Sequence, residues 1–290
     1  MGILVECTKD GAGNKNTGAK EQCLEGVTIR HSLATDEQEF ETVAAFKSLA
    51  AWKADRDLKK IIPLYEIEEY ATADTEDTFF EGNSKYLTKK GKKIRTFNCF
   101  LGLCSHNALK SYNGKKMRVY EHTNAQEIKG ISVDDVKVKG QLVRITVGKR
   151  IDALNDKPPY TPVTLEYEDY NEFEDNGVIV KPTWSHIELD GIFDVSLELV
   201  SASSTQIKFT VNGGCAGDDL ITSLEDADIT FVDASGDAVT HSFVAADANG
   251  IYTLTGTGFA NNSVINLDGI VSQTEATYES IAGLTVTGIA

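Results

Sequence analysis

The stretch Ile229-Thr-Phe-Val-Asp-Ala-Ser-Gly-Asp-Ala-Val239 decides the fold of the last third of the chain. It places a short apolar strand, Ile229–Val232, directly before the turn residues Ser235-Gly-Asp237. Further turn signals lie around it, at residues 212–214, 249–250 and 268–269. About seven short strands separated by such turns are typical of an immunoglobulin-like β sandwich.

The strands of this sandwich can be placed from the alternation of apolar residues and turn residues. The expected segments are Asp194–Val200, Gln206–Val211, Ile229–Val232, His241–Val244, Ile251–Thr255, Ser263–Leu267 and Leu284–Ile289. The pair of cysteines and the tryptophan that mark antibody domains are missing, because this region contains Cys215 alone and no tryptophan.

The composition of the chain changes after Asp190. Residues 193–290 contain one basic residue, Lys208, against 13 Asp and Glu, and they contain no Trp, Met or Pro. A length of 290 residues also exceeds the usual size of one domain. We therefore expect a mixed-charge β domain at 1–190 and an acidic immunoglobulin-like domain at 193–290.

The net charge of −16 limits the classes of partner. An acidic surface repels phosphate, which argues against a protein that reads or grips nucleic acid and suits a surface along which DNA slides. The apolar runs are too short to cross a bilayer, and the first residues lack the pattern of a secretory signal. Five irregularly spaced cysteines indicate free thiols in a protein assembled in a reducing cytoplasm.

The first domain begins with a polar arm at 8–21 that has no periodicity. A helix is expected at 36–58, with Thr35 and Gln38 as a capping box. A short helix is expected at 106–112, and strands at 61–68, 93–101, 117–121, 136–138, 142–147 and 163–167. This order of elements predicts a mainly β fold, an antiparallel β sandwich or barrel with one or two flanking helices.

Candidate chemical sites in the chain are poor. The segment Gly13–Lys20 resembles a phosphate-binding loop, but Ala19 separates the second glycine from the lysine. Cys99, Cys104 and His106 offer three zinc ligands with no evident fourth, so buried cysteines are the preferred interpretation. We therefore expect no catalytic residue, no cofactor and no metal, and hence not an enzyme.

Acidic turns in the last third leave one alternative open. Their carboxylates have the chemistry of a calcium site, but turn carboxylates that bind their own backbone are the preferred interpretation. The residues concerned are Asp218, Asp219, Glu225, Asp226, Asp228, Asp233 and Asp237.

One group of residues stands out, a long charged loop at 66–95. Its first half is acidic and ends in two phenylalanines, and its second half is basic. The acidic half and its end are Glu66, Glu68, Glu69, Asp74, Glu76, Asp77, Phe79 and Phe80, and the basic half is Lys85, Lys89, Lys90, Lys92, Lys93 and Arg95. A solvated surface hairpin is the plain interpretation. We favour an arm that packs head-to-tail on another subunit, with the phenylalanines as apolar anchors.

The chain resembles two kinds of known protein. Residues 221–239, 249–256, 278–280 and 284–290 are similar to immunoglobulin-like modules of bacterial surface proteins and tailed-phage virion proteins. The helix at 36–58, the arm at 66–95 and the strands between 117 and 167 resemble major tail tube proteins of long-tailed phages. That resemblance implies a stacked ring, usually a hexamer, with a lumen that passes DNA, and it transfers no catalytic residue.

The expected function is therefore that of a virion structural protein, most simply a tail tube subunit with an exterior immunoglobulin-like domain. Its partners would be further copies in stacked rings, other tail proteins, and DNA that passes without specific binding, with no membrane. It would be assembled in the bacterial host cytoplasm and reside in the virion tail. The alternatives are a phage head decoration or connector protein, and a glycan-binding surface or adhesion protein that uses the immunoglobulin-like module.

Overall fold

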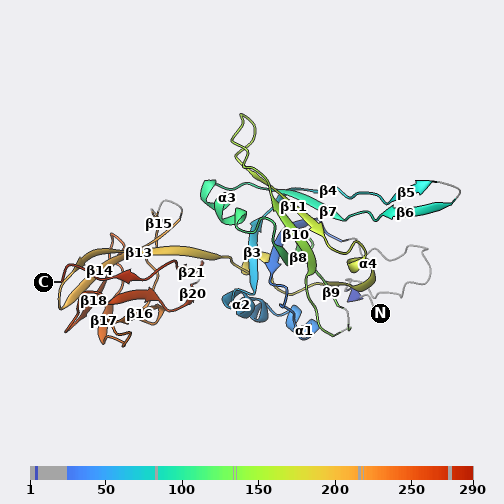
Figure 1. The fold of residues 1–290 in the computed structure, drawn as a ribbon. Coiled ribbons are helices and arrows are strands. Elements are labelled where there is room, and N and C mark those ends of the chain that lie inside the picture. The colour runs from blue at the N-terminus through green and yellow to red at the C-terminus, as the bar shows by residue number, and fades with distance from the viewer. Residues whose placement is uncertain are drawn as a thin grey trace. The chain divides into compact units, whose positions relative to one another are not determined.

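The structure is a computed structural model. It describes residues 4–5, 25–81, 84–132, 134, 136–214, 217, 219–273 and 276–289. The chain divides into two compact units, Met1–Leu189 and Asp190–Ala290, shown in Figure 1. This boundary coincides with the change in composition after Asp190.

The first unit is built on one ten-stranded sheet that is almost entirely antiparallel. Its strands are β1 (Leu4–Val5), β2 (Thr28–Ala34), β3 (Ile61–Glu66), β4 (Glu68–Thr72), β7 (Ile94–Cys99), β8 (Lys116–Thr123), β9 (Ile128–Ile131), β10 (Gln141–Val147), β11 (Thr161–Tyr167) and β12 (Gly177–Val180). The strand order is β1-β12-β9-β8-β10-β11-β7-β4, and β2 pairs with both β8 and β3. A separate two-stranded sheet joins β5 (Thr78–Glu81) to β6 (Lys85–Lys89).

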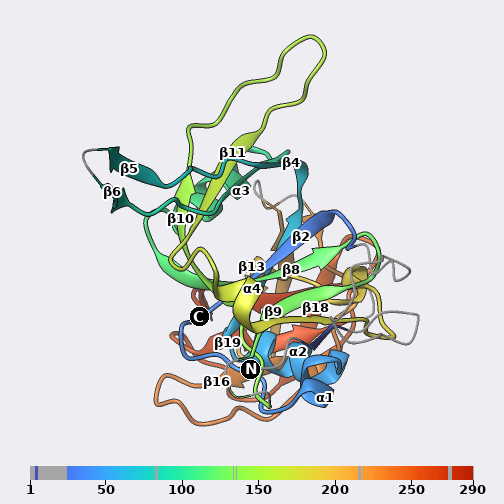
Figure 2. The same ribbon diagram turned by 90° about the vertical axis from the view of Figure 1, so that its right-hand side faces the viewer.

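The sheet closes into a barrel through β3 and β4, which are successive parts of one extended segment. β3 pairs with β2, while β4 pairs with β7 at the other end of the strand order. Between β3 and β4, the Ile67 amide donates a hydrogen bond to the Ile29 carbonyl of β2 at 2.9 Å. The pairings β2–β8–β10–β11–β7–β4/β3–β2 therefore form a closed ring, which can be followed in Figure 2.

Apolar side chains fill the barrel because inward and outward residues alternate along its strands. In β11 every second residue from Thr161 to Tyr167 is buried. The interior cluster draws on β2, β7, β8, β10 and β11, on Ile67 between β3 and β4, and on Leu109 of α3 (Leu103–Lys110). It contains Leu33, Ile67, Phe97, Cys99, Leu109, Met117, Val119, Val143, Ile145, Val147, Val163, Leu165 and Tyr167.

A second core lies where α1 (Val43–Phe46) and α2 (Leu49–Asp57) pack on the sheet. Trp52 is fully buried, and its ring centroid lies 4.8 Å from that of Phe40 and 4.9 Å from that of Tyr120. The Trp52 indole also donates to the Phe46 carbonyl at 2.7 Å. There are two further helices in this unit. α3 connects β7 to β8, and α4 (Glu172–Asn176) lies between β11 and β12 in the sequence.

The prediction of one helix from residue 36 to 58 is wrong in its first part. Phe40 instead forms a β bridge with Val138, and the Gln38 side chain binds the Tyr120 hydroxyl at 2.6 Å. The helix begins at Val43, where Thr42 accepts a hydrogen bond from the Ala45 amide at 3.1 Å. Tertiary contacts outweigh the local capping signal here.

The second unit is a two-layer β sandwich. Its larger sheet has the order β17-β18-β14-β13-β21-β20, with β15 on β14, and its smaller sheet has the order β16-β19-β22. The strands are β13 (Ile192–Ala202), β14 (Gln206–Gly213), β15 (Asp219–Leu220), β16 (Ile229–Val232), β17 (His241–Val244), β18 (Ile251–Gly256), β19 (Val264–Leu267), β20 (Ile270–Ser272), β21 (Thr277–Ser280) and β22 (Leu284–Thr285). Without β15, β20 and β21, these orders are the ABED and CFG sheets of a constant-type immunoglobulin domain.

The core of this sandwich lies between its two sheets. Phe209 and Tyr252 come from the larger sheet and Phe231 and Ile265 from the smaller one, and all four are buried. The expected turns are present, since Gly236 has a φ of 90°, a left-handed conformation that glycine adopts without strain. The predicted fold class, a mainly β chain with an immunoglobulin-like sandwich at its C-terminal end, is confirmed.

Several strands were not expected from the sequence. β2, β9 and β12 belong to the barrel sheet, and the hairpin β20–β21 adds to the edge of the sandwich with β21 parallel to β13. The segment expected as a strand at 136–138 forms no strand and contributes one isolated bridge, between Val138 and Phe40. None of the helices in the part of the chain described above is both long and apolar enough to cross a membrane.

The sandwich core gives a stability prediction. Replacing the fully buried Phe209 with alanine leaves a cavity, so we expect the free energy of unfolding of this unit to fall by about 3–5 kcal/mol. The same change at Phe193, whose side chain is 55% exposed, is the matched control and should cost far less. Chemical denaturation followed by circular dichroism measures both, and equal losses would contradict the assigned core.

Candidate subunit interface

The charged loop at 66–95 is a long β hairpin. β4 pairs with β7 at its root, Thr75 bridges Lys92 further out, and β5 pairs with β6 at its tip. The two strands come very close at Gly91, where a Cβ would lie 2.2 Å from the Thr75 carbonyl oxygen, so only glycine fits. The hairpin extends away from the barrel in both views (Figures 1 and 2), and every described residue of β5 and β6 is exposed.

The tip of the hairpin is apolar on both of its faces. Phe79 lies opposite Leu87, and Phe80 lies opposite Tyr86. Because successive residues of a strand point to opposite sides, these two pairs occupy opposite faces. The four side chains are 43–61% exposed. An isolated two-stranded hairpin is at best marginally stable in water, so this tip is suited to burial against a partner.

The acidic and basic halves of the loop lie side by side within the hairpin rather than on separate surfaces. At the root, Asp74 forms an ion pair with Arg95 and accepts a hydrogen bond from the Ile94 amide. At the tip, Glu81 lies 3.4 Å from the Lys85 ammonium. Asp77 accepts a hydrogen bond from the Gly91 amide at 2.6 Å. Much of the charge pattern therefore stabilises the hairpin itself.

Other charged residues of the loop bind elsewhere on the first unit. Glu66 lies 3.4 Å from the His186 ring, and Glu69 forms an ion pair with Lys157. Lys92 pairs with Glu166 of β11. The charged side chains of the loop for which the structure gives no hydrogen bond or ion pair to any described residue are Glu68, Glu76, Lys89 and Lys90.

A cavity of about 710 Å³ opens at the root of the hairpin. Its lining combines apolar rings with charges of both signs, and three of the fourteen residues expected at the interface take part, namely Asp74, Lys93 and Arg95. The remaining lining residues are Glu25, Gly26, Val27, Thr28, Tyr70, Thr72, Glu121, Lys129, Gln141, Tyr170, Phe173, Glu174, Gly177 and Ile179.

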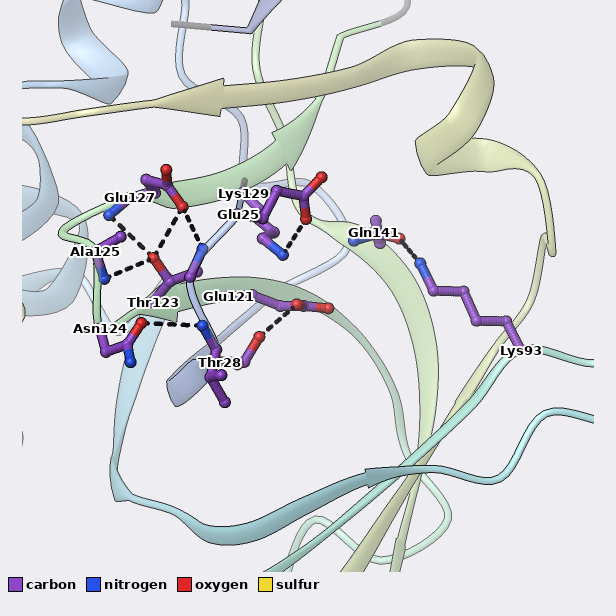
Figure 3. Close-up of polar contacts among 12 residues, drawn as sticks. Glu25, Thr28, Lys93, Glu121, Thr123, Asn124, Ala125, Glu127, Lys129 and Gln141 are labelled. Carbon is purple, nitrogen blue, oxygen red and sulfur yellow. Dashed lines mark hydrogen bonds and ion pairs between the residues drawn. The ribbon is translucent and has the colours of Figure 1, made fainter. Parts of the chain in front are cut away.

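Hydrogen bonds among the lining residues are shown in Figure 3. Glu121 of β8 is buried and accepts hydrogen bonds from the Thr28 hydroxyl at 2.9 Å and the Tyr167 hydroxyl at 2.6 Å. The Lys129 ammonium lies 2.5 Å from a Glu25 carboxylate oxygen. Most charges in the cavity are thus balanced by a neighbour.

Lys93 differs from the other cations of the cavity. Its ammonium donates to the Gln141 side-chain oxygen at 3.0 Å and lies 4.4 Å from the centroid of the Tyr167 ring and 5.2 Å from that of Phe173. Burial lowers the pKa of Lys93, and the nearby negative charge of Glu121 partly offsets this lowering. An ammonium has three donors, so Lys93 can bind a further acceptor that enters the cavity.

Burial also governs the neighbouring titratable groups. Burial alone would raise the pKa of Glu121, but His31, the Tyr167 hydroxyl and the lysines Lys129 and Lys93 outweigh it, and the pKa is lowered. Glu121 is therefore an anion at neutral pH. This arrangement binds and orients charged or polar groups, and it contains no nucleophile held against a general base.

The three candidate zinc ligands have separate roles. Cys99 is a buried free thiol, and burial raises its pKa to about 12. Cys104 is disulfide-bonded, so the prediction of free thiols is wrong at this residue. The buried His106 ring is 2.9 Å from the Thr161 hydroxyl. Across the described ranges, no group of three His, Cys, Asp or Glu side chains is arranged to hold a metal ion.

Some acidic side chains of the sandwich turns bind the backbone of their own turn, as Asp228 does with the Glu225 amide at 2.8 Å. Asp233 accepts hydrogen bonds from the amides of Ser235 and Asp237 at 2.8 and 2.9 Å, as a turn carboxylate does. Asp218, the arm at 8–21 and the segment Gly13–Lys20 lie outside the described residues.

Sequence reasoning found the hairpin but missed the cavity. The cavity is assembled from β2, β4, β7, β8, β9, β10, β12 and α4, and most of its residues are isolated in the sequence. The one available signal was in β8, where Glu121 and His122 directly follow Val119 and Tyr120 and are buried like them. Buried ionisable residues of this kind often mark a binding site.

The buried His31 beside Glu121 makes the stability of the first unit depend on pH. Burial lowers the pKa of His31 to about 4, below its ordinary value of 6.5, so the unfolded chain binds more protons between these pH values. The free energy of unfolding therefore falls on acidification, by about 2 kcal/mol from this group between pH 7 and pH 5.

We expect His31→Phe to flatten this part of the pH profile, measured by denaturant unfolding at both pH values. His241→Phe, in the other unit, is the control and should retain the wild-type slope of the first unit. Parallel profiles for wild type and His31→Phe would contradict the assignment.

Comparisons with family models and curated sequences identify no relative of the chain. The function therefore has to be argued from the hairpin, the barrel and the cavity themselves.

Proposed function

We propose that the chain is a virion structural protein, a tail tube subunit whose first unit polymerises into rings through the β5–β6 hairpin. The observation that carries this proposal is the tip with Phe79 and Leu87 on one face and Phe80 and Tyr86 on the other. Such a tip contributes nothing to the core of its own barrel. It gains free energy only when a partner covers it, at roughly 25 cal/mol for each Å² of apolar surface removed from water.

The architecture of the first unit supports the same function. The strands that form the closed ring of the barrel have no unpaired edge among them. A projecting element is therefore the natural means of contact between copies. Major tail tube proteins, which the sequence resembles, also combine an antiparallel β sandwich or barrel, a flanking helix and a long charged loop. Of the net charge of −16, residues 193–290 contribute −12, with 1 basic and 13 acidic residues, and the rest of the chain contributes −4. The first unit is thus mildly acidic, which agrees with passage of DNA without binding.

The immunoglobulin-like unit is proposed to be the exterior domain. Its single basic residue, Lys208, and its many carboxylates favour a solvated position. A glycan-binding function would require a platform of exposed aromatic residues, but Phe209, Phe231, Tyr252 and Phe259 are buried in the sandwich core. Of the seven aromatic residues in this unit, Phe193 alone is exposed. A head decoration protein or a connector protein would use the same assembly contacts. The place of the protein in the virion, head or tail, distinguishes these alternatives from a tail tube subunit.

The hairpin tip provides the first test. We expect the double change Phe80→Ser with Tyr86→Ser to leave a folded monomer, because both side chains are 61% exposed. Loss of two buried aromatic side chains from each contact should weaken association by more than about a hundredfold. Sedimentation velocity and negative-stain electron microscopy measure the assembled fraction.

The matched control is Leu58→Ser with Leu103→Ser, since these apolar residues are 65% and 61% exposed elsewhere on the first unit. We expect the control to assemble as wild type does. Rings or tubes of normal yield from the hairpin variant would refute the proposed role of the tip.

Charge on the hairpin provides a second test. Lys89 and Lys90 are exposed and carry no ion pair to a described residue, so Lys89→Glu with Lys90→Glu alters the hairpin surface without breaking an internal contact. We expect weaker assembly at about 50 mM salt and a smaller difference from wild type at about 0.5 M, because salt screens exposed charges. Light scattering across a salt series measures this.

Lys110→Glu with Lys149→Glu changes the net charge by the same amount away from the hairpin and serves as the control. If both double variants respond identically to salt, the lysines of the hairpin act only through net charge and do not set the contact.

A further inference from the structure

The shape of the hairpin tip restricts what can receive it. A strand with one apolar face can lie on a flat surface, but the pairs Phe79–Leu87 and Phe80–Tyr86 point in opposite directions. A flat surface would cover only one pair and leave the other in water. The tip therefore requires a concave receptor with two apolar walls.

The cavity at the hairpin root is concave and carries apolar side chains among its charged and polar ones. Val27, Tyr170 and Phe173 line it together with Tyr70 and Ile179, and Val27 and Tyr170 are 60% and 40% exposed. Its volume of about 710 Å³ is in the range of pockets that enclose most of the surface of a bound group. Unburied apolar surface is thus present on both the tip and the cavity.

The charges of the tip and the cavity are also compatible. Beyond its apolar pairs the tip carries Glu81 and Lys85. The cavity offers Lys93, which has donors to spare, and the exposed carboxylate of Glu174. Pairing Glu81 with Lys93 and Lys85 with Glu174 would match opposite signs.

The tip cannot reach the cavity of its own molecule. Thr72 at the root lines the cavity, and eight residues of extended chain separate it from Phe80. At roughly 3.3 Å per residue the tip lies about 25 Å from its own cavity. Internal pairings from Glu68 to Glu81 keep the hairpin extended away from the barrel, so a tip that enters the cavity must come from another copy.

The geometry points to a contact in which the β5–β6 tip of one copy inserts into the root cavity of a second copy. This inference rests on the proposed function and names the partner surface of the hairpin. The contact is head-to-tail, because the tip and the cavity are different surfaces of the same chain. A head-to-tail contact closes into a ring when the rotation between copies allows it, and every tip and cavity is then occupied.

Photo-crosslinking tests the contact without assuming its location. The photoreactive residue p-benzoylphenylalanine replaces Phe80 in the full chain, and the assembled protein is irradiated as a mixture of isotopically light and heavy copies. We expect most crosslinks to join residue 80 of one copy to residues 25–28 or 170–179 of another. Crosslinks that form in assembled particles but fall mainly elsewhere overturn the cavity contact and leave the role of the hairpin intact.

A blocking substitution provides an independent measurement. Val27→Trp narrows the cavity from its rim and should reduce the assembled fraction at least tenfold, while Val136→Trp, at a residue 52% exposed and outside the cavity, should leave it unchanged. Equal assembly of the two variants overturns the inference. A wild-type chain that stays monomeric at every concentration overturns both this inference and the proposed function.

Discussion

A single extended segment, residues 61–72, holds the first unit together by pairing with two different neighbours. Its first half pairs with β2 and its second half with β7, and the Ile67 amide joins the two ladders through the Ile29 carbonyl. Without this segment the strands from β2 to β7 would form an open sheet. Closure encloses the interior cluster of apolar residues and also fixes the direction in which the chain leaves the barrel.

The hairpin follows from that closure. β4 and β7 are neighbours in the barrel, and the chain between them continues as a two-stranded ladder beyond the barrel end. Asp74 and Arg95 pair at the point of departure, and Gly91 permits the close approach of the two strands. The barrel therefore presents the apolar tip at a defined distance and orientation, and the same strands contribute Asp74, Lys93 and Arg95 to the cavity at the root.

The sequence was most informative where structure is local. The strands Ile229–Val232 and His241–Val244 of the sandwich were predicted with their observed bounds, because each is a short apolar run between turn residues. β2 was missed because Arg30 and His31 interrupt its apolar pattern, and both are buried only through barrel closure. The early start of the predicted helix failed for a similar reason, since Phe40 pairs with the distant Val138.

The charged loop could be identified in the sequence because its charges cluster. Which charges pair within the hairpin could not, because that depends on the strand register. The cavity could not be foreseen, because Glu25, Glu121, Lys129 and Phe173 meet only when four separate segments come together. Long-range closure thus limits what the sequence reveals, for the fold and for the site alike.

Assembly through the hairpin requires that the β5–β6 tip be covered by another copy of the chain. A cryo-electron microscopy reconstruction of the purified, assembled protein that resolves residues 78–89 tests this most directly. We expect density from a neighbouring copy on both faces of the tip, against Phe79 and Leu87 on one side and Phe80 and Tyr86 on the other. An assembly in which the tip is surrounded only by solvent, or lies on its own barrel, would contradict it.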